Sequence, residues 1–122
     1  MMRSLLAATA ALLIVACTQP DDSLTLDQAG EQFVRLGLEL GEYDDYYIDS
    51  YVGPEEWQQQ ASLSLRSKQQ LAPDIAAFFA AVEAIEPTTD EDSQRHKSLL
   101  GKVQAMDTRI RMVNGEEFTF AE

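Results

Sequence analysis

The chain has 122 residues, with 21 acidic and 9 basic side chains and a formal net charge of −12. Nucleic-acid binding depends on Lys and Arg side chains that release counterions from phosphates, and the sequence has neither a basic stretch nor a basic tail, so this class is excluded. The single cysteine excludes an intrachain disulfide, so a hydrophobic core must hold the fold together.

The amino-terminal segment has the organisation of a secretory signal peptide over residues 1–16. Arg3 precedes an apolar run that is too short for the roughly 20 residues of a membrane-spanning helix. The small residue Ala16 stands directly before Cys17, which is the position of the acylated cysteine in bacterial lipoproteins. We therefore expect cleavage before Cys17 and attachment of fatty-acyl chains, such as palmitate, to its sulfur. A free thiol after an ordinary signal peptide is the alternative.

The acyl chains on Cys17 are expected to be the whole membrane attachment, because the rest of the chain is too acidic to adsorb on anionic headgroups. Residues 17–23 are polar, and we expect them to form a lipidated tether. We expect residues 24–122 to form a helical module. Thr18 is not aspartate. In a cell with two membranes, the likeness to sorted lipoproteins therefore implies the outer membrane, facing the periplasm.

Helical periodicity begins behind a capping signal. Thr25 and Gln28 are spaced as a capping box, and Gly41 is placed to end the helix. Between them, apolar residues recur in steps of three and four: Leu26, Ala29, Phe33, Leu36 and Leu40. Residues 42–53 are rich in tyrosine and acids and predict a turn with a short helix.

Two prolines are expected to open the next two helices. Pro54, with acids behind it, favours a second helix that runs to about Leu71. Pro73 opens a third helix that ends before Pro87. The apolar face of this third helix consists of Ile75, Phe78, Phe79, Val82 and Ile85.

The fourth helix has the clearest boundaries. Capping oxygens stand at residues 88–90, and Asn114 and Gly115 tolerate the backbone conformation that ends a helix. No segment alternates as a strand does. The sequence therefore predicts an all-α, four-helix antiparallel arrangement.

The last residues resemble the opening of a further helix. Thr119 and Glu122 have capping-box spacing, which favours a module that is the amino-terminal part of a larger helical domain. The alternative is that Phe118 and Phe120 fold back into the core and the cap is coincidental.

The sequence offers no assembled catalytic or metal site. Zinc sites use three or four convergent His, Cys, Asp or Glu ligands, whereas the single histidine, His96, stands among polar residues and is expected to be a solvated surface residue. No serine lies in a nucleophile turn. We therefore assign no catalytic residue, no metal ligand and no cofactor to this chain.

The acidic, tyrosine-rich stretch is the remaining candidate. Asp44, Asp45 and Asp49, beside the tyrosines, could line a cleft in which paired carboxylates act as acid and base, or bind calcium, although the usual calcium-loop pattern is missing. Tyr51 and Trp57 are further candidates for such a cleft. We favour a purely structural role for this stretch. The aromatic rings are then expected to pack between helices with their polar ends exposed to water, and the acids to cap helices or face solvent.

Residues 33–57 resemble the start of a group of uncharacterised bacterial secreted proteins and lipoproteins related to helical zinc metallopeptidases. In that group an Asp-x-Tyr-x-Gly-Pro element follows the first helix, and here it reads Asp-Ser-Tyr-Val-Gly-Pro at residues 49–54. Residues 109–116 and 118–122 are also similar. The resemblance implies a His-Glu zinc motif far downstream. Nothing in this chain matches that motif, so no catalytic residue is carried over.

These observations lead to three hypotheses. The first is a lipid-anchored, extracytoplasmic module of a metallopeptidase-like protein, without catalysis of its own and with the remainder of a longer polypeptide as its partner. The second is a complete small lipoprotein that binds a protein or ligand in an apolar groove between helices. The third is an enzyme that acts through the acidic, tyrosine-rich stretch.

Overall fold

The structure, a computed structural model, describes residues 23–119. In this range it consists of four helices and no strand: α1 (Leu26–Gly41), α2 (Glu55–Leu63), α3 (Lys68–Glu83) and α4 (Asp90–Val113). The predicted all-α fold is confirmed. The predictions for Cys17 and the signal peptide concern residues outside this range, and residues 120–122 of the capping box that was expected to open a further helix also lie outside it. Among the described helices, none combines the length and the apolar character needed to cross a bilayer.

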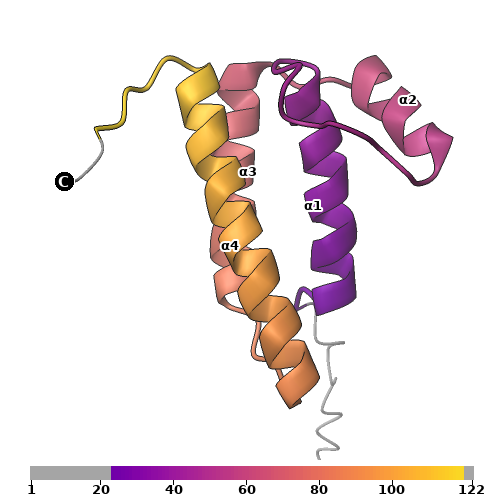
Figure 1. Ribbon diagram of the computed structural model, residues 1–122, viewed down its shortest axis with the longest axis vertical. Coiled ribbons are helices and arrows are strands. Elements are labelled where there is room, and N and C mark those ends of the chain that lie inside the picture. The colour runs from indigo at the N-terminus through magenta and orange to yellow at the C-terminus, as the bar shows by residue number, and fades with distance from the viewer. Residues whose placement is uncertain (1–22, 120–122) are drawn as a thin grey trace, which may run out of the picture.

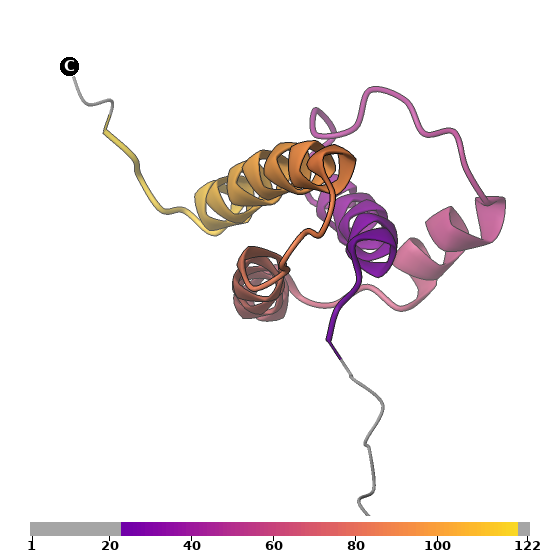
Figure 2. The same ribbon diagram turned by 90° about the horizontal axis from the view of Figure 1, so that it is seen from below.

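Three long helices form a bundle, and the short one lies beside it. Figure 1 shows α1, α3 and α4 running up, down and up along the long axis, and the end-on view places them at the corners of a triangle (Figure 2). Helix α2 contacts the outer side of α1. The described chain enters at one end of the bundle and leaves at the other (Figure 1).

The core is the interior of this triangle, and α1, α3 and α4 supply it. The residues of the buried cluster are Ala29, Leu36, Leu40, Leu71, Ile75, Phe78, Val82, Val103, Met106 and Ile110. Most of them are the positions that the helical periodicity of the sequence picks out. Burying a large apolar side chain contributes about 1.5 to 3 kcal/mol, so this cluster is the main source of stability.

The ends of α1 and α4 follow the predicted caps. The Thr25 hydroxyl accepts the Gln28 N–H at 3.2 Å, and the Gln28 side chain accepts the Thr25 N–H at 2.9 Å, which completes the capping box. Thr89 caps α4 through the Asp92 N–H at 3.0 Å. At the other end Gly115 has a φ of 93°, in the left-handed region that favours glycine.

The structure corrects the predicted boundaries in the middle of the chain. Residues 43–54 are turns and bends without the expected short helix. Helix α2 ends at Leu63 rather than near Leu71, and α3 begins five residues before Pro73 instead of at it. Ser67 caps α3 by accepting the Gln70 N–H at 3.2 Å.

The burial of Leu71 explains why α3 begins before Pro73. Leu71 is fully buried in the core cluster, so the turn that carries it gains enough from packing to stay helical. Pro73 lies on the exposed side of this helix. It has no N–H to donate to the carbonyl four residues earlier, so one helical hydrogen bond is lost there.

Candidate functional site

The segment between α1 and α2, residues 43–54, folds back onto α1, and we call it the tyrosine loop. Tyr47 and Ile48 lie against two glycines of the helix. A Cβ at Gly41 would come within 3.1 Å of the Ile48 side chain, and one at Gly37 would touch Tyr47 at 3.7 Å. The small residues at the end of α1 therefore let the loop approach closely.

The Asp-x-Tyr-x-Gly-Pro element at residues 49–54 is held by a hydrogen bond between two of its own residues. The Tyr51 hydroxyl donates a hydrogen bond to the Pro54 carbonyl at 2.9 Å. To do so the ring crosses Gly53, where a Cβ would lie 2.5 Å from the hydroxyl oxygen. Only glycine leaves room for the ring, so the spacing of tyrosine, glycine and proline positions Tyr51.

The tyrosine loop closes one end of an open groove between α1 and α4, which has a volume of about 480 Å³. Loop residues 47–51 form one wall. Helix α1 contributes Phe33, Val34, Gly37 and Leu38, and α4 contributes Lys102 and Ala105. The groove is thus mostly apolar, with one acid from the loop and one lysine from α4 at its rim.

The structure brings together two of the four candidate residues. Asp49 and Tyr51 both line the groove, whereas Asp45 is exposed and is not among its lining residues. Trp57 lies between α1 and α2, where the Arg35 guanidinium stacks 4.2 Å from the ring centre. The prediction that Trp57 packs between helices is confirmed.

The tyrosines were expected to pack between helices with their hydroxyl groups in water, and this prediction holds only in part. Tyr43 donates its hydroxyl proton to the Arg66 carbonyl at 2.5 Å, so its polar end is bonded to protein rather than wet. The Tyr47 ring is half-buried, and burial together with the nearby Asp44 carboxylate raises the pKa of its hydroxyl. Tyr46 is 90% exposed and packs against nothing.

Asp44 ties the tyrosine loop to α4. Its buried carboxylate accepts hydrogen bonds from the Arg109 guanidinium and, at 3.2 Å, from the Tyr46 N–H. The bond with Arg109, aided by the backbone N–H, holds the pKa of Asp44 below its ordinary value although burial opposes this. A carboxylate held ionised in this way is poorly suited to donate a proton near neutral pH.

Arg66, in the connection between α2 and α3, is held by α1 and α3. Its guanidinium donates to both carboxylate oxygens of Glu39, at 3.0 and 2.5 Å, and to Asp74 at 2.9 Å. These bonds raise the already high pKa of Arg66. Glu39 is only 8% exposed, whereas the Arg66 side chain is 39% exposed, so the pair joins a buried carboxylate of α1 to an arginine that reaches it from the surface.

His96 is not the solvated residue that the sequence predicts. It is half-buried, and its Nε2 lies 2.7 Å from the carbonyl oxygen of Val82, so the ring bridges α4 and α3. The helix face that looks polar in sequence turns toward α3 at this position. Within residues 23–119, no three His, Cys, Asp or Glu side chains are grouped so as to hold a metal ion.

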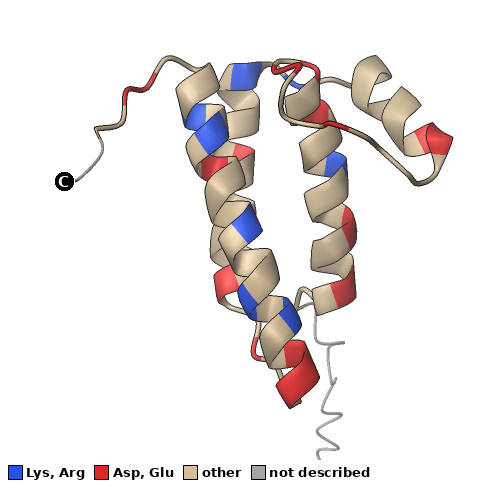
Figure 3. Cartoon of the chain, viewed as in Figure 1, with Lys and Arg blue, Asp and Glu red and all other residues tan. Residues whose placement is uncertain are grey.

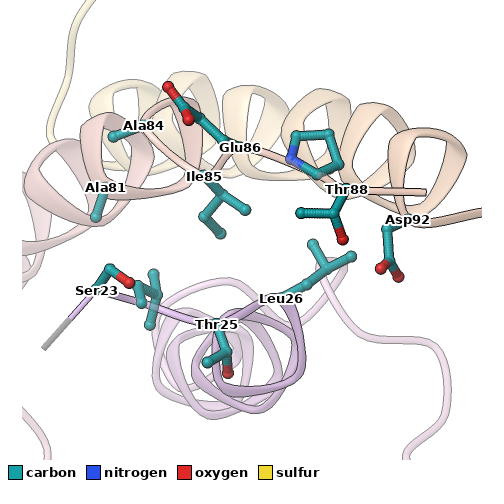
Figure 4. A pocket seen from close by; sticks show the side chains of 11 residues that line it. Ser23, Thr25, Leu26, Ala81, Ala84, Ile85, Glu86, Thr88 and Asp92 are labelled. Carbon is teal, nitrogen blue, oxygen red and sulfur yellow. The ribbon is translucent and has the colours of Figure 1, made fainter. Parts of the chain in front are cut away.

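A second hollow lies at the opposite end of the bundle, between the start of α1 and the α3–α4 connection, with a volume of about 670 Å³. Figure 4 shows Leu26 and Ile85 pointing into the space between the two segments. Two of its polar residues already have structural roles, since Thr25 caps α1 and the Asp92 carboxylate pairs with Arg95 at 3.1 Å. The groove between α1 and α4 is therefore the better candidate site.

Comparison of the chain with family models, curated proteins and solved structures finds no match. The resemblance to metallopeptidase-related proteins therefore stays a hypothesis, and the site has to be interpreted from its own geometry.

Replacing Arg66 by methionine should destabilise the fold by about 1 to 3 kcal/mol, because the buried Glu39 carboxylate loses its charged partner. Urea unfolding followed by circular dichroism measures the difference. Arg95→Met is the matched control, since its partner Asp27 is 87% exposed in the pair and such pairs contribute about 0 to 1 kcal/mol. Equal losses in the two variants would contradict the special role of Arg66.

The Asp44–Arg109 pair should make the free energy of unfolding depend on pH. The pKa of Asp44 is lower in the folded chain than its ordinary value of 3.8, so the pair stabilises the fold above that value and loses this effect as pH falls through the lowered pKa. Urea unfolding midpoints between about pH 6 and about pH 3 should therefore fall less steeply for Asp44→Asn than for the wild type. Parallel curves for the two proteins would refute this assignment.

Proposed function

We propose that this chain is a non-catalytic helical binding module, held at the cell envelope by acyl chains on Cys17, and that it binds through the groove between α1 and α4. The observation that carries the proposal is the groove itself. Its volume of about 480 Å³ is in the range of small-molecule and peptide sites, which are mostly apolar with a few polar groups that orient the ligand. Asp49, Tyr51 and Lys102 are such groups here.

The state of the loop acids supports binding rather than catalysis. Asp44 is paired with Arg109, and Asp45 and Asp49 are exposed to water. Acid and base catalysis by carboxylates requires environments that move their pKa values apart. Asp45 and Asp49 are not enclosed with a second carboxylate in the way that a catalytic acid pair is.

In one version of this proposal, the module is the amino-terminal part of a longer, metallopeptidase-like protein. The resemblance at residues 49–54 supports it, and so does the position of that element at the groove, where a further helix could pack. The zinc ligands would then come from outside this chain. Sequencing the natural gene product tests this form: a continuation with a His-Glu zinc motif supports it, and a product that ends at Glu122 favours a complete small lipoprotein.

The anchor can be tested on the protein in its own membrane. Mass spectrometry of the mature amino terminus should show Cys17 as the first residue, carrying acyl chains. A chain that starts at residue 17 with Cys17→Ser, exported behind an ordinary cleavable signal peptide so that no apolar leader remains, should appear in the soluble fraction, because the acidic domain has no electrostatic attraction to headgroups. An unmodified Cys17 thiol, or a Cys17→Ser protein that remains membrane-bound, would reject this part of the proposal.

The groove can be tested with Nile red, an uncharged apolar dye that becomes fluorescent when shielded from water. Ala105 is an exposed residue on the groove wall, so Ala105→Phe should fill the groove and weaken dye binding by about tenfold or more, roughly 1.4 kcal/mol. Ala77→Phe makes the same change on an exposed site of α3 and should leave binding unchanged. Equal dye binding by both variants would reject the groove as the site.

A further inference from the structure

We propose that the partner of the groove between α1 and α4 is a cationic, amphipathic helical segment of another protein. This inference rests on the proposed function and adds the class of the partner. It depends on three features of the described residues: the shape of the groove, the charge of the tyrosine loop, and apolar side chains that stand exposed beside it.

The groove can accept the apolar face of a helix. Its walls are residues 33–38 of α1, loop residues 47–51 and one turn of α4 with Lys102 and Ala105, and the two helices run in the same direction along the bundle (Figure 1). Small residues stand on both walls, Gly37 on α1 and Ala105 on α4, and let an incoming helix approach closely. Larger apolar groups, Phe33, Val34 and Leu38, lie beside them. Such a surface fits the helix-in-groove mode of recognition, in which spaced apolar side chains act as anchors.

The charge next to the groove favours a basic partner. The tyrosine loop, residues 43–54, contains three acidic side chains and no Lys or Arg, and Figure 3 shows acidic positions along this loop. Arginines neutralise Glu39 and Asp44, whereas Asp45 and Asp49 are exposed. The net charge of −12 would also speed the encounter with a basic segment.

Two apolar side chains of the tyrosine loop, next in sequence to the groove-lining residues 47 and 51, are exposed. Tyr46 is 90% exposed and Val52 is 97% exposed, and both belong to the tyrosine loop. Lys102, on the α4 wall, is the basic exception. It gives the groove an acidic side and a basic side, so a cationic helix should place its basic residues toward the loop.

The test uses fluorescence anisotropy with a labelled leucine-lysine helical peptide of about 14 residues, which as a helix is about 21 Å long. The mature chain carries Cys17→Ser so that no acyl chain competes for the peptide. We expect saturable binding, and binding at least about tenfold weaker for a leucine-glutamate peptide of the same pattern. Ala105→Phe should weaken binding about tenfold or more, and Ala77→Phe should not change it.

Charge variants separate specific docking from general attraction. The double variant Asp45→Asn, Asp49→Asn should weaken binding about threefold to tenfold at about 0.05 M salt and much less at about 1 M salt. The matched pair Asp90→Asn, Glu91→Gln, at the exposed start of α4, should change affinity less than about twofold. Lys102→Glu, a surface change that avoids the core, should strengthen binding and serves if Ala105→Phe does not fold.

Several outcomes would overturn the inference: no binding of the leucine-lysine peptide, unchanged binding in both the Ala105→Phe and Lys102→Glu variants, or equal weakening by the two acid pairs. If Nile red still binds in the groove while the peptide does not, the partner class is wrong and the binding module stands. If neither the dye nor the peptide depends on Ala105, the proposed function fails as well.

Discussion

The arrangement of the molecule depends on the ion pair between Glu39 and Arg66. The Glu39 carboxylate is almost removed from water, which is costly unless a partner fills its hydrogen-bonding positions. Arg66 does so with two parallel bonds and also reaches Asp74, while its carbonyl accepts the Tyr43 hydroxyl. A single residue in a short connection therefore fixes α1, α3 and the beginning of the tyrosine loop relative to one another, and the position of α2 follows.

A second arginine completes this scheme at the opposite side of α1. Arg109 of α4 holds Asp44, so the first two residues of the tyrosine loop are fastened to different elements, Tyr43 to the α2–α3 connection and Asp44 to α4. Helix α1 is flanked by α3 and α4 in the core, by α2 and by the loop. The groove lies where α1, α4 and loop residues 47–51 meet.

The local parts of this structure could be predicted, and the long-range parts could not. Apolar periodicity and capping oxygens at Thr25 and Thr89 act within a few residues, so α1 and α4 were accurately predicted. The start of α3 was predicted wrongly because Ser67 and Pro73 both signal a helix start, and only the burial of Leu71 decides between them. Asp49 and Tyr51 were found because their motif is local. Their groove partners on α4, Lys102 and Ala105, lie far along the chain and carry no signal in the sequence.

The direction in which α1 runs has a geometric consequence for a protein tethered by its amino terminus. The described chain enters at the start of α1, and the tyrosine loop packs against its last turns, near Gly41. At 1.5 Å per residue this places the loop about 22 Å above the point of entry. If Cys17 carries acyl chains, as we propose, the chain enters the bundle at the end nearer its attachment, and the tyrosine loop stands at the end from which partners outside the membrane can approach.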